Sequence, residues 1–228
     1  MISHSRPGIA PSTIPAISIM RAITALLGLC STLASATIFQ NDQIRTTDYP
    51  DTTIAPITYA KNSTWRSYPP NATELSYKGR WDSRYISYWT APGLKFGFQG
   101  SQIAITFGNW TTPGVLIAFR VGGLDWELSN VTCNSTNLLA DSVTMDFDSG
   151  SPQTFELRVT NWGYGVQIQN VHVNGGQLIK IPDYTRRMEL IGDSLSAGQY
   201  RTLEGISSYT FGLAVSLQMI SQSIADMY

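Results

Sequence analysis

The chain has 228 residues, of which 43% are hydrophobic and 14% charged, and its formal net charge at pH 7 is −1. The hydrophobic content suffices for a packed core, so a largely disordered chain is not expected. The near-zero net charge does not indicate binding to nucleic acid. A neutral or polar binding partner is more consistent with this composition.

Residues 1–36 are predicted to be a secretory signal peptide. Met20 is followed by an arginine, residues 22–29 form an apolar run, and residues 34–36 are the small residues that a signal peptidase accepts. The apolar run is shorter than the about 20 residues that span a bilayer, so no membrane anchor is expected. The mature chain would begin at Thr37, and Met20 is an alternative start of the translated chain. We therefore expect a secreted, extracellular protein.

N-glycosylation sequons agree with passage through the secretory pathway. A sequon that carries a glycan must lie on the protein surface. Cys30 would leave with the signal peptide, so Cys133 is the remaining cysteine of the mature chain. The sequons begin at Asn62, Asn71, Asn109, Asn130 and Asn134.

The middle of the chain is predicted to be a β-sandwich. Residues 37–75 are rich in Thr, Asn, Pro and Asp and indicate an irregular lead-in. Beyond them, short β-rich runs alternate with Gly and Pro turns, which favours two packed sheets over residues 76–182. Residues 115–121 give the clearest signal, because large apolar side chains alternate along the run. The expected strands are 85–89, 94–98, 102–107, 115–121, 143–147, 155–159 and 166–173.

The pattern changes at residues 183–228. A short apolar strand at 188–191 precedes Gly192-Asp193-Ser194, and helical spacing follows at 207–217. Strand, tight turn and helix form the opening unit of an α/β domain. A serine on such a turn projects its hydroxyl beside the backbone N–H groups of the helix start, which can stabilise an oxyanion.

Residues 191–198, with the sequence IGDSLSAG, resemble the nucleophile block of the GDSL, or SGNH, ester hydrolases. The preceding part is similar to the β-sandwich domain of secreted fungal carbohydrate esterases of family 2, notably GRW at 79–81 and YWTAPGLKF at 88–96. The resemblance covers about residues 75–217. It implies a mainly β chain, in which a jelly-roll-like β-sandwich precedes the first βα unit of an SGNH hydrolase domain.

The resemblance also implies a reaction. Ser194 Oγ would attack an ester carbonyl, and the Ser194 N–H would contribute to the oxyanion hole. Gly192 would permit the tight backbone, and Asp193 would brace the turn. The implied substrate is an acylated plant polysaccharide or oligosaccharide, with no cofactor and no nucleic-acid or membrane partner.

Several parts of the family's machinery are not assigned in this chain. The resemblance requires a second-block glycine and a third-block asparagine as oxyanion donors, and a histidine base near the C-terminus. His4 lies in the leader, and His172 is interpreted as an outward-facing strand residue rather than the base. Residues 218–228 show no β-rich run where a second strand should follow. We therefore expect residues 183–228 to be a truncated hydrolase domain that exposes apolar surface and has weak or no activity.

A second interpretation is a non-catalytic β-sandwich that binds glycans or a partner and carries a vestigial hydrolase fragment. Ser194 would then be an ordinary helix-capping serine. Trp110 and Trp162 are the tryptophans expected to be exposed, because polar or glycine residues flank them. No metal site is predicted: the remaining acidic candidates, Asp141, Asp146, Asp148 and Glu156, match no calcium-binding spacing.

Overall fold

The computed structural model is mainly β, as the sequence predicts. The signal-peptide prediction for residues 1–36 lies outside the described residues. Among the described residues, no helix is long and apolar enough to cross a membrane. The described residues are 39–40, 43–44, 52–55, 57, 63–89, 91–161, 163–182, 186–193, 195–198, 204–217 and 220–225.

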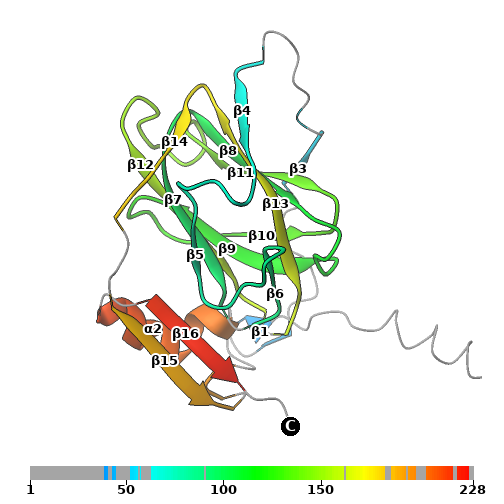
Figure 1. The fold of residues 1–228 in the computed structure, drawn as a ribbon, viewed down its shortest axis with the longest axis vertical. Helices are drawn as coiled ribbons and strands as arrows, with labels where there is room; N and C mark the ends of the chain where they lie inside the picture. The colour runs from blue at the N-terminus through cyan, green and yellow to red at the C-terminus, as the bar shows by residue number, and fades with distance from the viewer. Residues whose placement is uncertain are drawn as a thin grey trace, which may run out of the picture. The chain divides into compact units, whose positions relative to one another are not determined.

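One six-stranded antiparallel sheet has the order β10-β9-β12-β7-β14, and β5 also pairs with β7 (Figure 1). The register places Leu157 opposite Phe119 on one side and Leu94 on the other. The strands are β5 (Ser76–Lys78), β7 (Gly93–Gln99), β9 (Val115–Val121), β10 (Glu127–Val131), β12 (Gln153–Val159) and β14 (Gln177–Ile179).

The second six-stranded antiparallel sheet has the order β3-β11-β8-β13-β4, and β6 also pairs with β13. A separate two-stranded antiparallel pair joins β1 (Phe39–Gln40) to β2 (Gln43–Ile44). The strands of the second sheet are β3 (Thr53–Ile54), β4 (Trp65–Tyr68), β6 (Ile86–Ser87), β8 (Gln102–Phe107), β11 (Thr136–Asp141) and β13 (Val166–Asn174).

The core lies between these two sheets, so the described part of residues 76–182 is a two-sheet sandwich. The alternation in β9 is confirmed, because Val115, Ile117, Phe119 and Val121 are all buried in this core. Phe96 stacks on Phe155, with ring centroids 5.0 Å apart, across the paired strands β7 and β12. Burial of such large apolar side chains is the main source of stability in a sandwich of this kind.

The lead-in is less irregular than its composition predicts. β3 and β4 lie within residues 37–75 and pair with β11 and β13. Both strands are too short to show a periodicity, and neighbouring strands supply their backbone hydrogen bonds.

The strand predicted at residues 143–147 is wrong. These residues form consecutive turns after β11, and Val143 is 87% exposed. The Asp141 carboxylate accepts a hydrogen bond from the Val143 N–H at 2.9 Å, and the Asp141 carbonyl accepts one from the Met145 N–H at 2.9 Å. Such Asx-turn geometry competes with strand pairing, which explains the difference.

The C-terminal segment forms a strand, helix and strand (Figure 1). β15 (Arg187–Gly192) pairs in parallel with β16 (Ile220–Ala225), and η1 (Glu204–Ser207) and α2 (Tyr209–Ser216) lie between them in the chain. The expectation that residues 218–228 lack a second strand is therefore wrong. Pairing with β15 supplies hydrogen bonds to a sequence with weak β propensity, so tertiary context prevails over composition.

Candidate active site

The carboxyl end of β15 leads directly into the Gly-Asp-Ser turn. Ser194, the predicted nucleophile, lies outside the described residues, but both of its chain neighbours are described. A Cβ at Gly192 would collide with the Ser196 side chain, so this turn requires glycine for its close backbone approach.

Asp193 makes the hydrogen bonds expected of a brace. Its Oδ1 atom accepts the N–H of Leu195 at 3.0 Å and the N–H of Ser196 at 3.4 Å. Its carbonyl accepts the N–H of Ala197 at 3.2 Å, and the chain leaves this turn at Gly198 with a φ of 79°. These hydrogen bonds occupy the N–H groups of the three residues that follow position 194. Asp193 is therefore bonded to the backbone of the turn.

The turn is also held by the start of α2. The Thr210 hydroxyl donates to the Ser196 carbonyl at 3.1 Å, and the hydroxyls of Ser196 and Tyr209 lie 3.2 Å apart. Ser208 is the N-cap of α2, because its Oγ accepts the Phe211 N–H at 3.2 Å. Small buried hydroxyl residues thus connect the turn to a capped helix end.

A hydrogen bond and a cation–ring contact are among the described contacts that join this segment to the sandwich. The Gly205 N–H donates to the Thr160 carbonyl at 3.0 Å. The Arg158 guanidinium carbon lies 5.3 Å from the centre of the Phe211 ring, and the same group donates to the Ala91 carbonyl at 3.2 Å. The part of the segment that carries η1 and α2 therefore contacts the end of β12 and the residue Thr160 that follows it.

The sequence does not reveal these supporting residues. Arg158 and Thr160 lie more than thirty positions before the turn in the chain, and no local pattern connects them to it. Ser208 does carry a signal, because a serine directly before an apolar periodic run is typical of a helix N-cap.

His172 lies on β13, away from this turn. It points away from the core, as predicted, but it is only 5% exposed rather than open to solvent. Its Nδ1 and Nε2 atoms make hydrogen bonds with the hydroxyls of Ser67 and Thr106, the latter at 2.7 Å. Burial lowers the pKa of His172 to about 4, so the ring is neutral at pH 7. Its hydroxyl partners give it a structural role in the second sheet.

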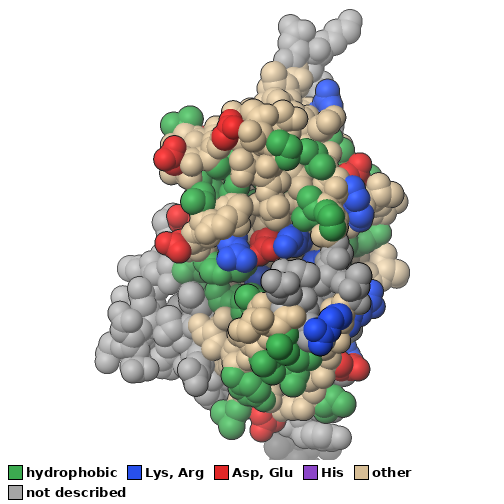
Figure 2. Space-filling view, turned by 90° about the vertical axis from the view of Figure 1, so that its left-hand side faces the viewer, with side chains coloured by type: hydrophobic (Ala, Val, Ile, Leu, Met, Phe, Trp, Pro, Cys, Tyr) green, Lys and Arg blue, Asp and Glu red, His purple; other side chains and the backbone are tan. Residues whose placement is uncertain are grey.

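The C-terminal segment exposes apolar side chains, as predicted. Figure 2 shows hydrophobic side chains gathered on the lower part of one face of the molecule. A parallel strand pair is normally covered on both faces, so this surface is unusual for such a unit. The exposed residues are Ile191, Leu195, Tyr209, Leu213, Val215 and Leu217.

The predicted glycosylation residues differ in accessibility. Asn130 is only 8% exposed, and its amide nitrogen donates to the Gly114 carbonyl at 2.6 Å. A glycan on that nitrogen would disturb this hydrogen bond, so we expect Asn130 to carry none. Asn71, Asn109 and Asn134 are exposed, and Asn62 lies outside the described residues.

The remaining candidates are distributed over the sandwich. Trp110 is 49% exposed, as predicted, whereas Trp162 lies outside the described residues. Cys133 is a free, half-buried cysteine. Within the described ranges, no group of three or more His, Cys, Asp or Glu side chains could hold a metal ion. Among the described residues, those that line a pocket of about 470 Å³ lie between positions 52 and 145.

Comparison with known proteins relates the arrangement to solved hydrolases. No protein-family model and no curated protein match the chain. A family two carbohydrate esterase from Cellvibrio japonicus matches with a TM-score of 0.60 and 14% identity, over 72% of this chain and 52% of that one. The fold resembles that of family two carbohydrate esterases.

Two further structures agree. An acetyl xylan esterase from the rumen bacterium Butyrivibrio proteoclasticus has a TM-score of 0.61 and 14% identity, over 72% of this chain and 49% of that one. A family two carbohydrate esterase from Clostridium thermocellum, solved with cellohexaose, has a TM-score of 0.58 and 18% identity, over 66% of this chain and 50% of that one. At these identities the likeness concerns the fold alone. The chain spans about half the length of these structures' chains.

Proposed function

We propose that this protein is a secreted carbohydrate esterase that removes acetyl or similar acyl groups from plant polysaccharides, with Ser194 as its nucleophile. The observation that carries the proposal is the pair of hydrogen bonds from Leu195 and Ser196 to the Asp193 carboxylate. They brace a turn between a strand and a helix around position 194, in a chain with the fold of carbohydrate esterases.

In this reaction Ser194 Oγ forms a bond to the acyl carbon while a base takes the hydroxyl proton. The carbonyl oxygen becomes an oxyanion, to which the Ser194 N–H would donate a hydrogen bond. The ester C–O bond then breaks, and the sugar oxygen leaves with a proton. Water attacks the acyl-serine, releases the carboxylic acid and restores the serine.

The base and the further oxyanion donors are the unassigned part of this mechanism. His172 is engaged with Ser67 and Thr106 on the second sheet, which favours a structural role for it. A missing general base commonly costs about 10²–10⁴ in rate. We therefore expect weak or no turnover by this chain alone.

The substrate class and secretion have separate support. The Butyrivibrio proteoclasticus neighbour is an acetyl xylan esterase, and the Clostridium thermocellum neighbour is solved with cellohexaose. The signal-like leader and three exposed sequon asparagines agree with an extracellular protein.

The proposal is tested by measuring acetate release from acetylated xylo-oligosaccharides with and without added imidazole, which can replace a missing base. We expect imidazole to raise the rate for the unmodified chain and not for Ser194→Ala. Ser216→Ala is the matched control, because Ser216 lies exposed on α2 and its hydroxyl donates only to the Gly212 carbonyl at 2.9 Å. Equal rates for the unmodified chain and Ser194→Ala under all conditions would exclude Ser194 as nucleophile.

A further inference from the structure

Two exposed aromatic side chains on the sandwich have no part in the esterase mechanism. Trp110 lies in the loop after β8 and is 49% exposed, and Tyr88 directly follows β6 and is 48% exposed. Most other aromatic side chains of the described sandwich are at least half-buried. We call Tyr88 and Trp110 the aromatic pair.

Gly165 brings the aromatic pair together. A Cβ at Gly165 would collide with the Tyr88 ring and would come within 2.8 Å of the Trp110 carbonyl oxygen. The Thr112 N–H donates to the Gly165 carbonyl at 2.8 Å, and the Gly165 N–H donates to the Thr112 hydroxyl at 2.9 Å. The Tyr88 ring and the Trp110 backbone thus lie against one hydrogen-bonded backbone junction, and a fixed junction lowers the entropy cost of binding a ligand there.

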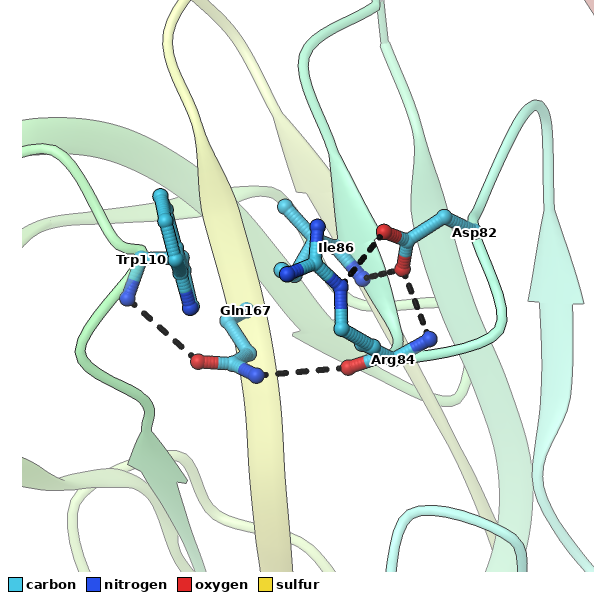
Figure 3. Close-up of polar contacts among 5 residues, drawn as sticks. All are labelled: Asp82, Arg84, Ile86, Trp110 and Gln167. Atoms are coloured by element: carbon cyan, nitrogen blue, oxygen red, sulfur yellow. Dashed lines mark hydrogen bonds and ion pairs between the residues drawn. The ribbon is translucent and has the colours of Figure 1, made fainter.

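Polar side chains lie beside the Trp110 ring (Figure 3). The Arg84 guanidinium carbon is 5.2 Å from the centre of the ring. Gln167 connects the two residues, since its Oε1 accepts the Trp110 N–H at 3.3 Å and its Nε2 donates to the Arg84 carbonyl at 3.3 Å. The backbone of Trp110 is therefore fixed by Gln167, and its ring is contacted by the Arg84 guanidinium.

Asp82 fixes the position of Arg84. Its carboxylate accepts the backbone N–H groups of Arg84 at 2.8 Å and Ile86 at 2.9 Å, and it lies 3.3 Å from the Arg84 Nε atom. Because the two charges are paired, the cluster beside Trp110 has little net charge. A neutral polar ligand suits such a surface better than an anionic one.

We propose that Tyr88, Trp110 and Arg84, none of which belongs to the Gly-Asp-Ser turn, form a binding site for the pyranose rings of a neutral polysaccharide. The C–H face of a pyranose ring is apolar and can stack on an aromatic ring, while its hydroxyls need donors and acceptors at the edge. The aromatic pair provides the first feature, and the Arg84–Asp82 pair provides the second. The site would hold the sandwich on the polysaccharide without taking part in acyl transfer.

Asn109 bears on how the site is tested. It is exposed and begins a sequon directly before Trp110, so a glycan there would lie next to the aromatic pair. Binding is therefore measured on the full chain carrying Asn109→Gln, which has no glycan at this position.

Binding of cellohexaose and xylohexaose is measured by isothermal titration calorimetry. We expect Trp110→Ala to weaken binding at least about tenfold, Tyr88→Ala to weaken it several-fold, and Trp110→Tyr to retain part of it. Trp126→Ala is the matched control, because Trp126 also faces an arginine, with the Arg120 guanidinium carbon 4.5 Å from its ring. Circular dichroism of each variant verifies the fold.

The proposal is overturned if the Asn109→Gln chain binds neither oligosaccharide, if Trp110→Ala binds as tightly as its parent, or if Trp126→Ala loses as much affinity. Ser194→Ala should bind normally. A chain that binds the oligosaccharides but has no serine-dependent esterase activity would support this site and refute the proposed function. A chain that has serine-dependent esterase activity but does not bind through Trp110 would support the proposed function and refute this site.

Discussion

The backbone N–H of Gly205 donates a hydrogen bond of 3.0 Å to the carbonyl of Thr160, and this bond joins the C-terminal segment to the sandwich. Gly205 also lies close to Ala91, whose N and Cβ atoms would both be 3.1 Å from a Cβ at this position. A Cβ here would be tightly packed, and the neighbouring atoms would have to shift to accommodate it.

Gly205→Ala should destabilise the protein by about 1–3 kcal/mol, because the new methyl group overpacks this junction. The free energy of unfolding from urea titration measures the effect. Gly212→Ala is the control with the same chemical change. Gly212 lies inside α2 and a Cβ there meets nothing within 4 Å, so alanine should stabilise the helix by about 0.5–1 kcal/mol. Equal effects of the two substitutions would refute the close contact at Gly205.

His172 should make stability depend on pH between about 6.5 and 4. Burial lowers its pKa from 6.5 to about 4, so the unfolded chain takes up a proton more readily than the folded chain. The stabilising contribution is complete above pH 6.5 and is lost as the pH falls to 4, by up to about 3 kcal/mol. Unfolding free energies at pH 7.5 and pH 4.5 should differ less for His172→Gln than for the unmodified protein. An equal difference for both would contradict the neutral, buried state of this ring.

Glu156 should contribute at higher pH and lose its contribution in acid. Burial raises the pKa of Glu156, but hydrogen bonds and charge from Lys95 and Arg120, each with a nitrogen 2.7 Å away, outweigh it and leave the pKa lowered. The contribution is therefore present above the ordinary pKa of about 4.3 and disappears as the pH falls through the lowered value. Glu156→Gln should cost about 1–3 kcal/mol at pH 7 and less at pH 3.

A matched control for Glu156 is Glu189→Gln. Glu189 pairs with Arg80 at 3.8 Å on an exposed part of the C-terminal segment, where ion pairs contribute about 0–1 kcal/mol. If Glu189→Gln lowered the free energy of unfolding as much as Glu156→Gln does, burial of the Lys95–Glu156–Arg120 cluster would not add to its stabilising effect.

Glycan occupancy should follow accessibility. In protein secreted from a eukaryotic host, mass spectrometry after enzymatic deglycosylation should find modified asparagine at one or more of the exposed sequons and none at Asn130. The Asn130 amide is buried and already donates to Gly114. Occupied Asn130 in soluble, folded protein would contradict the packing of β10. The exposed sequon residues are Asn71, Asn109 and Asn134.

Strands with apolar alternation could be predicted from the sequence, and strands with polar sequences could not. β9 is found because Val115 to Val121 alternate over seven residues. β11 is missed because it begins with Thr136 and Asn137, both buried with their polar groups bonded. Its position depends on pairing with β8, and such long-range pairing leaves no local pattern.

The candidate site shows the same limit. The sequence IGDSLSAG predicts the strand, the turn and the bracing aspartate, since each depends on neighbouring residues. The links from Thr210 to Ser196 and from Gly205 to Thr160 join residues that are distant in the chain, so only the folded structure reveals them. The strand at β16 was missed because its hydrogen bonds come from β15.

The most direct test of the nucleophile is detection of the acyl-enzyme. The chain is incubated with 4-nitrophenyl acetate and digested, and the peptide that contains residues 192–198 is analysed by mass spectrometry. We predict that one acetyl group is attached at Ser194 and persists, because deacylation also needs a base, and that Ser194→Ala lacks it while Ser216→Ala retains it. Acetylation found only on other residues, or equally in Ser194→Ala, would contradict the assignment of Ser194 as nucleophile.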